Sequence, residues 1–149
     1  MVYADYWIAL QEGHLTYGTF EDYKSIINRH IKPSMKGLRM RDVLPDDITR
    51  MMKEVANFSK SVHDKTYMLA KQMFTNAYDN KLISENPCPK MHAGGRDPVE
   101  RQALTNEQMT TLIEAVKGTR AYVFCMIGLY SGLRREEILG LKWDCVRLT

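Results

Sequence analysis

Residues 61–82 read SVHDKTYMLAKQMFTNAYDNKL, and this stretch has the pattern of a long amphipathic helix. Apolar residues recur in it at three- and four-residue intervals, which places them on one side of a helix and polar residues on the other. Ser61, with Asp64 three residues later, is expected to cap the helix, which should run to about Leu82. The apolar side comprises Val62, Leu69, Ala70, Met73, Phe74 and Ala77.

Three shorter stretches with helical periodicity precede it. The first covers Tyr3–Leu10. Thr19, with Asp22 three residues on, is expected to begin the second, and Pro33 to end it. Residues 45–47 (Pro-Asp-Asp) predict the start of a third, because proline suits the first turn and acids suit the positive end of a helix. Together the four helices predict a mainly α fold with a small bundle that has its own core.

The stretch from 86 to 102 has a different composition. It holds prolines and glycines and almost no large apolar residues, as linkers do. We therefore expect a helical domain at 1–85, a linker at 86–102 and the beginning of a second domain at 103–149. The residues that mark the linker are Pro87, Pro89, Gly94, Gly95 and Pro98.

The part after the linker is expected to be helical at first. Thr105 and Gln108 have the spacing of a capping box, and Gly118 is expected to end the helix they begin. An apolar helix is expected at 122–130, and the residues after Leu141 have a strand-like pattern. Apolar residues are frequent at 122–141, and we expect self-association through that stretch.

Bulk composition is that of a globular protein, with 44% hydrophobic and 26% charged residues and a net charge of +3. No stretch is long and apolar enough for a membrane helix, and no secretory signal is visible, so a cytoplasmic location is expected. Three cysteines without C-x-x-C spacing argue against a disulfide framework. Cys88 and His92 have no second pair of ligands nearby, so no metal is expected.

Residues 130–143, YSGLRREEILGLKW, carry the clearest chemical signal. An apolar helix stops at Gly132, and Arg134 stands at the start of the next turn, where free backbone N–H groups and a guanidinium suit a phosphate oxygen. Glu137 lies on the same face, within reach of the guanidinium. Residue types alone leave a second interpretation open, in which Arg134, Arg135, Glu136 and Glu137 form a solvated helix face with local ion pairs.

The same motif resembles the first catalytic-arginine motif of the tyrosine recombinases, the phage integrase family. The resemblance rests on Gly132-Leu133-Arg134 with Glu137, Leu141 and Trp143. It extends in the family's order through Thr19, Tyr23, Ile26, Ile27 and Ile31, Ile48, residues 61–66, Phe74, Ala77, Ile83, Asn86-Pro87, Leu104-Thr105 and Gln108. Two positions depart from the family pattern: Cys145 stands where an acid is frequent, and Leu44 where a capping threonine is common.

The resemblance implies a SAM-like core-binding domain followed by the opening helices of a catalytic domain. Arg134 would bind the scissile DNA phosphate, supported by Glu137, in a reaction that proceeds through a phosphotyrosine intermediate without cofactor or metal. The family's nucleophilic tyrosine lies downstream of this motif, so this chain is expected to be inactive alone. The partner is double-stranded DNA of a phage or mobile element, with self-association on DNA in the full-length protein and neither a membrane nor a small-molecule substrate.

In the family, the second and fourth helices supply most DNA contacts. On this sequence they correspond to a set of lysines, hydroxyls and one imidazole near helix starts, which suit phosphate oxygens and base edges. These candidate DNA-binding residues are Thr16, Tyr17, Lys24, Lys60, Ser61, His63, Lys65, Thr66 and Lys71.

Two other functions remain open at this stage. The first is a non-enzymatic DNA-binding regulator in which residues 132–143 belong to a helix-turn-helix, which requires a recognition helix to follow. The second is a helical protein-interaction domain that binds no DNA, for which the arginine motif would be a coincidence. Among recombinases, integrase, resolvase and transposon roles are also left open.

Overall fold

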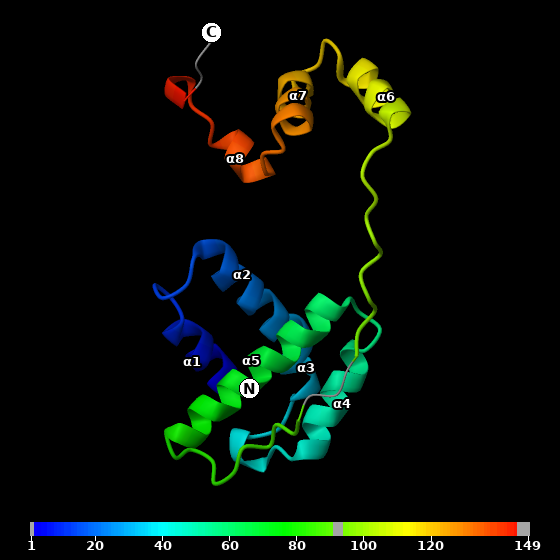
Figure 1. Ribbon diagram of the computed structural model, residues 1–149. Helices are drawn as coiled ribbons and strands as arrows, with labels where there is room; N and C mark the ends of the chain where they lie inside the picture. Colours follow the sequence, from blue (N-terminus) through cyan, green and yellow to red (C-terminus); the bar gives the residue numbers. More distant parts are fainter. Residues whose placement is uncertain (1, 91–93, 146–149) are drawn as a thin grey trace. The chain divides into compact units, whose positions relative to one another are not determined.

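The computed structural model describes residues 2–90 and 94–145, and helices joined by turns and loops make up most of it (Figure 1). The chain divides into two compact units, residues 1–99 and 100–149. Within the described residues no strand forms, and the one β-type pairing is an isolated parallel bridge between Ser59 and Arg96. The prediction of a mainly α fold is confirmed. His92 lies outside the described residues.

The first unit is a bundle in which α5 crosses the earlier helices (Figure 1). Its elements are α1 (Val2–Leu10), α2 (Tyr17–Ile26), the π-helix η1 (Ile27–Ile31), α3 (Lys32–Ser34), the 3-10 helix η2 (Met40–Asp42), α4 (Pro45–Val55) and α5 (Lys60–Asp79).

The core of this unit is built around α5. Leu69, Met73 and Phe74 are fully buried, and they pack with buried side chains from the other helices, including Trp7 and Ile31. Fully burying an aliphatic or aromatic side chain contributes about 1.5–3 kcal/mol, so this apolar side of α5 supplies much of the unit's stability. The predicted apolar pattern of α5 is confirmed at the buried positions Leu69, Ala70, Met73, Phe74 and Ala77.

The second helix differs from its prediction at both ends. It begins at Tyr17, with Thr16 rather than Thr19 at the N-cap position. The prediction that Pro33 ends it is wrong, because the helical path continues through η1 and α3. A proline clashes with the preceding turn of a regular α-helix. Here the wider π-turn lies directly before Pro33, with the Lys32 N–H donating to the Ile27 carbonyl, and this relieves the clash.

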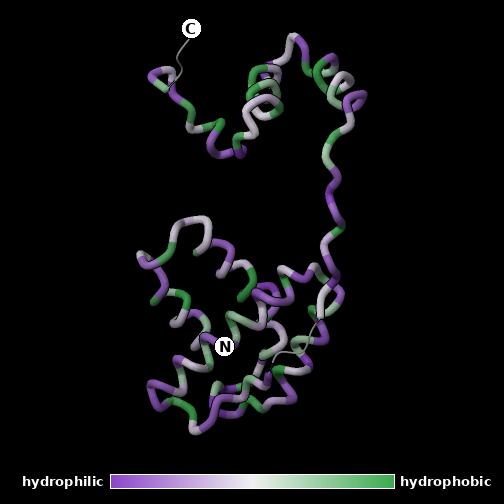
Figure 2. Tube along the Cα trace, viewed as in Figure 1, coloured by the Kyte–Doolittle hydropathy of each residue, from purple (hydrophilic) through white to green (hydrophobic). Residues whose placement is uncertain are grey.

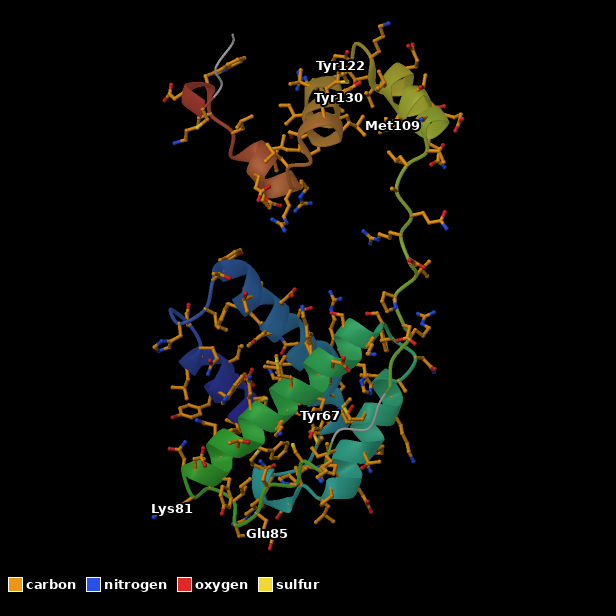
Figure 3. All side chains as sticks on the ribbon, in the orientation of Figure 1. Tyr67, Lys81, Glu85, Met109, Tyr122 and Tyr130 are labelled. Carbon is orange, nitrogen blue, oxygen red and sulfur yellow. The ribbon has the colours of Figure 1, made fainter. Side chains whose placement is uncertain are left out.

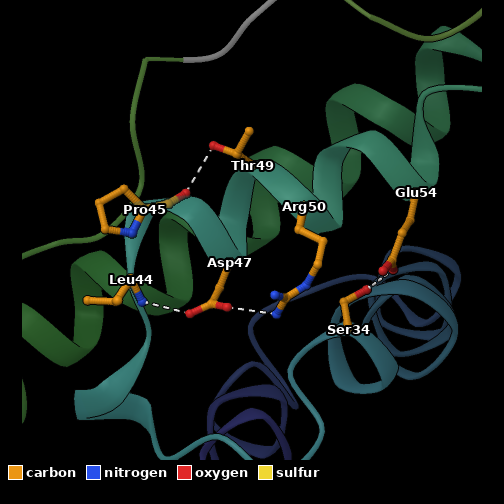
Figure 4. Close-up of polar contacts among 7 residues, drawn as sticks. All are labelled: Ser34, Leu44, Pro45, Asp47, Thr49, Arg50 and Glu54. Carbon is orange, nitrogen blue, oxygen red and sulfur yellow. Dashed lines mark hydrogen bonds and ion pairs between the residues drawn. The ribbon is translucent and has the colours of Figure 1, made fainter.

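Helix α4 begins where predicted, at Pro45 (Figure 4). The Leu44 N–H donates to the Asp47 carboxylate at 3.0 Å, which satisfies one backbone donor at the helix start. Asp47 also pairs with Arg50 at 2.7 Å. Leu44 has no side-chain oxygen to complete a reciprocal cap, so Asp47 alone provides the side-chain cap. Elsewhere on α4, Glu54 accepts a hydrogen bond from the Ser34 hydroxyl and so ties α4 to α3.

Helix α5 begins two residues earlier than predicted and ends about three residues earlier. Ser59, and not Ser61, is the N-cap, and its hydroxyl accepts the Val62 N–H at 3.4 Å. At the other end Lys81 has a left-handed backbone with φ 58°. The N–H groups of Lys81 and Leu82 return to the carbonyls of Tyr78 and Ala77, both at 2.9 Å, which is the hydrogen-bond pattern of a Schellman motif.

The chain after α5 packs back onto the first unit. Cys88 is half-buried against the core, and the Tyr67 hydroxyl, labelled on α5 in Figure 3, donates to the Pro89 carbonyl. Gly94 and Arg96 lie against the turn before α5. Residues 86–99, which the sequence predicts to be part of a linker, are thus grouped with the first unit.

The second unit contains α6 (Asn106–Val116), α7 (Ala121–Ser131), α8 (Arg135–Leu139) and the 3-10 helix η3 (Trp143–Cys145). The predicted capping box is confirmed: the Gln108 N–H donates to the Thr105 hydroxyl at 3.3 Å, and the Thr105 N–H donates to the Gln108 side chain at 2.9 Å. Gly132 ends α7 in the left-handed conformation with φ 67°.

The residues after α8 differ from two sequence expectations. The strand-like prediction after Leu141 is wrong for Trp143–Cys145, which form η3, while residues 146–149 lie outside the described residues. The helix-turn-helix alternative requires a recognition helix after α8, and residues 140–145 hold only η3. Within the described part of the chain, no helix is both long and apolar enough to cross a membrane.

Candidate nucleic-acid interface

The candidate residues of α2 lie at its exposed start and along its exposed side. Thr16 is exposed at the N-cap, and its hydroxyl lies 2.9 Å from that of Thr19. Tyr17, the next residue, is 82% exposed. Lys24 is also exposed, and its ammonium lies 3.4 Å from the Glu21 carboxylate and 5.8 Å from the centre of the Phe20 ring. Each of these groups is accessible to a large ligand.

The candidates of α5 that remain accessible lie opposite its buried side. Lys60 and Ser61 occupy the first turn and are exposed, and Lys71 is exposed about three turns further on. The Lys60 ammonium lies 3.6 Å from the Asp97 carboxylate, and both side chains are more than half exposed. An ion pair in such a position is weak enough for a phosphate to displace the carboxylate.

Lys65 joins the two helices. Its ammonium lies 2.9 Å from the Asp22 carboxylate of α2, 43 positions earlier in the sequence. The exposed fractions of the two side chains are 43% and 62%, so the pair lies at the surface. Lys65 therefore makes a direct side-chain link between α2 and α5.

Two candidate residues are in the interior, which is a correction to the sequence-based set. His63 is 3% exposed, and its Nδ1 lies 3.0 Å from the Asp64 carboxylate. Thr66 is fully buried, and its hydroxyl donates to the Val62 carbonyl at 2.7 Å. Helical periodicity places both on the side of α5 that packs inward, so neither side chain is accessible to a duplex.

Arg134 and Glu137 lie together in the second unit. The Arg134 N–H donates to the Glu137 carboxylate at 2.8 Å, and the Arg134 guanidinium lies 3.3 Å from the other carboxylate oxygen. The Arg134 side chain is 87% exposed. Glu137 therefore orients both the backbone and the side chain of Arg134, and the donors of the guanidinium that Glu137 does not occupy remain open to an anion.

Sequence reasoning missed the acids that face the candidate lysines. Asp22 and Asp97 lie far from Lys65 and Lys60 along the chain, so no local spacing signals these pairs. It also missed Ser59 as the cap of α5, although a serine stands at both 59 and 61. Only the backbone direction before the helix decides between them, and at Ser59 that backbone is extended, as the N-cap position requires.

The chain is similar in sequence to phage integrases. Residues 2–56, from α1 into the turn after α4, match the family model described as "Phage integrase, N-terminal SAM-like domain". This match and the two relatives described next support the tyrosine recombinase family. A protein named "Tyrosine recombinase XerC-like" from Caldanaerobacter subterraneus is 28% identical over 136 residues, which cover 84% of this chain and 34% of that protein.

A second relative, named "Integrase", comes from Streptomyces ambofaciens. It is 23% identical over 147 residues, which cover 95% of this chain and 37% of the relative. The chain thus spans about a third of the length of these curated relatives. No solved structure matches it significantly. The helical first unit is consistent with the SAM-like N-terminal domain of integrases that residues 2–56 match.

Proposed function

We propose that this chain recognises double-stranded DNA as part of a site-specific tyrosine recombinase of a phage or other mobile element. The observation that carries the proposal is the exposed side of α5, where Lys60, Ser61, Lys65 and Lys71 face outward and Lys65 connects to α2. Ammonium and hydroxyl groups at such positions suit phosphate oxygens, which fix a protein's register on the duplex. Thr16, Tyr17 and Lys24 extend this surface along α2.

The second part of the proposal concerns Arg134. Its guanidinium, held by Glu137 and otherwise exposed, would bind a DNA phosphate, and in the longer recombinases it would stabilise charge on the scissile phosphate. The proposed chemistry of such a protein is cutting and rejoining of DNA through a phosphotyrosine intermediate. The proposal requires no small-molecule substrate, and it places the protein in the cytoplasm, a reducing compartment in which Cys88, Cys125 and Cys145 stay free thiols.

Fluorescence anisotropy with a labelled duplex tests DNA recognition. The K65A/K71A double variant should bind more weakly than the wild-type chain, and the slope of log affinity against log salt should fall by up to about 2, because each phosphate contact contributes about 0.9. The matched control is K36A/K53A, which removes two exposed lysines outside the proposed surface. Equal losses in the two double variants would reject the surface, and no binding at low salt would reject DNA recognition.

We also propose that residues 122–141 mediate self-association. Every described residue of the second unit is at least partly exposed, and Val123, Tyr130 and Leu139 are 64%, 73% and 67% exposed. Figure 2 shows the hydrophobic colour of α7 within this unit. Apolar side chains exposed along one segment are typical of surfaces that pack against protein.

Sedimentation velocity at rising protein concentration tests self-association. The wild-type chain should shift to faster-sedimenting species, and L139E should reduce that shift because it places a charge in the contact. Q102E, which adds the same charge at an exposed polar position, should leave it unchanged. A wild-type chain that stays monomeric throughout would reject this part of the proposal.

A further inference from the structure

Residues 94–97 form a short segment, here called the strap, that lies against the turn between α4 and α5. The Arg96 N–H donates to the Phe58 carbonyl at 2.8 Å, and the Arg96 carbonyl accepts the Lys60 N–H at 2.9 Å. These two bonds make the parallel bridge between Ser59 and Arg96. Lys60 is the first residue of α5, whose N–H has no partner within the helix, so the Arg96 carbonyl caps α5 from outside.

The close approach of the strap depends on two glycines. A Cβ atom at Gly94 would lie 2.5 Å from Nε2 of His63. A Cβ atom at Gly95 would lie 2.7 Å from Cα of Lys60 and 2.9 Å from Cβ of His63, and Gly95 also has a left-handed backbone with φ +80°. Any larger residue at these positions would push the strap off α5, so the glycines have a packing role beyond loop flexibility.

The forces that hold the strap are few. Each backbone hydrogen bond makes a modest net contribution, and the exposed Lys60–Asp97 pair contributes little. Arg96 and Asp97 are exposed, so the strap buries no large apolar side chain of its own. Segments with few buried apolar contacts open locally at a lower free energy than the core, which here is built around Phe74.

We propose that residues 94–97 dock on and release from the start of α5 as a unit, and that docking sets the length of free chain between the two units. With the strap docked, the free segment before the Thr105 cap is Pro98–Leu104, which spans at most about 25 Å at ~3.3–3.6 Å per residue. Release adds the strap and extends that limit to about 40 Å. The proposal does not depend on the ligand of the proposed interface.

Hydrogen exchange of the full chain tests docking at two amides. In the wild-type chain the Arg96 and Lys60 N–H groups should exchange with the same opening free energy, lower than that of the Phe74 N–H. G95A should raise the exchange rates of both amides about tenfold or more and leave Phe74 protected. The control is G13A, which has the same left-handed backbone, φ +81°, but open space around a Cβ atom. Different opening energies for the two amides in the wild-type chain would overturn the proposal even if G95A failed to fold.

Limited trypsin cleavage gives a second readout within the same chain. Cleavage after Arg96 requires an open strap, whereas Arg101 lies in the free segment, so the ratio of cleavage at Arg96 to that at Arg101 should rise about tenfold in G95A and stay unchanged in G13A. G94A should act like G95A. Because its clash is with the His63 ring, G94A should have a much smaller effect in an H63A background. Full additivity of G94A and H63A, or an unchanged cleavage ratio in G95A, would overturn the proposal.

Discussion

Lys65 of α5 and Asp22 of α2 form an ion pair of 2.9 Å between positions 43 residues apart. Because both side chains are substantially exposed, the pair contributes less than about 1 kcal/mol to folding. The position of the pair is more informative than its strength. Helices α2 and α5 contact each other there, and both are proposed to bind DNA. A carboxylate in that position competes with phosphate for the Lys65 ammonium.

Replacing Asp22 by asparagine therefore separates stability from DNA affinity. D22N should change the free energy of unfolding by less than about 1 kcal/mol and should raise affinity for a duplex severalfold at low salt, because one repulsive charge is lost and Lys65 is released. Urea unfolding and fluorescence anisotropy measure the two effects. D42N, which removes an exposed acid paired with Arg41, is the control. An equal gain in affinity from D42N would show that only net charge matters.

The two serines at the start of α5 should differ in their effect on stability. S59A removes the hydroxyl that accepts the Val62 N–H and should cost about 0.5–1 kcal/mol, whereas S61A, inside the first turn and exposed, should change stability by less than about 0.5 kcal/mol. Urea unfolding followed by circular dichroism measures both variants. A larger loss of stability in S61A than in S59A would show that Ser61 is the N-cap, as the sequence pattern predicts.

The end of α5 offers a stabilising substitution. Lys81 occupies the left-handed position of the Schellman motif, where a Cβ atom costs about 1 kcal/mol and glycine costs nothing. K81G should therefore raise the free energy of unfolding by about 0.5–1 kcal/mol, although the greater freedom of glycine in the unfolded chain offsets part of the gain. Lys36→Gly, at an exposed position without positive φ, should destabilise instead. A lower Tm for K81G than for the wild-type chain would contradict the assignment of Lys81 to the left-handed position.

His30 should make folding stability depend on pH. Burial, and secondarily the nearby Arg29 charge, lower the pKa of His30 from its ordinary value of 6.5, and its ring packs edge-on against Phe58 at 5.0 Å. A histidine whose pKa is lower in the folded chain binds protons more readily when unfolded. Its contribution to stability is therefore present above about pH 6.5 and is lost as the pH falls through the lower, folded-state pKa.

Urea unfolding across a pH series tests this dependence. H30Q should reduce the loss of stability on acidification, because glutamine does not titrate. H14Q serves as the control, because His14 is exposed and, within the described part of the chain, its imidazole makes no hydrogen bond or ion pair. The same acid dependence in H30Q as in the wild-type chain would show that other groups cause it.

The cysteines should differ sharply in reactivity. Burial raises the pKa of Cys88 to about 12, although the Lys71 charge opposes the shift, so almost no thiolate forms at about pH 8. Cys145 is exposed. Iodoacetamide should therefore label Cys145 first and Cys88 only after denaturation, as peptide mass mapping would show. A C125S/C145S variant gives the rate at Cys88 alone, and fast labelling there would contradict its placement against the core.

The sequence by itself determined the elements whose causes lie within a few residues. The Thr105–Gln108 cap, the proline start of α4 and the apolar side of α5 all follow from local spacing, because the interacting groups lie within one or two helical turns. The spacing of Arg134 and Glu137 likewise indicated their contact, since residues three apart share a helix face.

Tertiary structure decided what depends on groups distant in sequence. Pro33 stays within the helical path because the chain widens into η1 before it, and no residue pattern announces a π-turn. Ser59 caps α5 at the point where the strap also meets the helix. His63 and Thr66 have polar side chains, yet packing against the core and Gly94 buries them. Hydrophobic periodicity assigns a residue to a side of a helix, but only the completed packing determines which sides remain open to a partner.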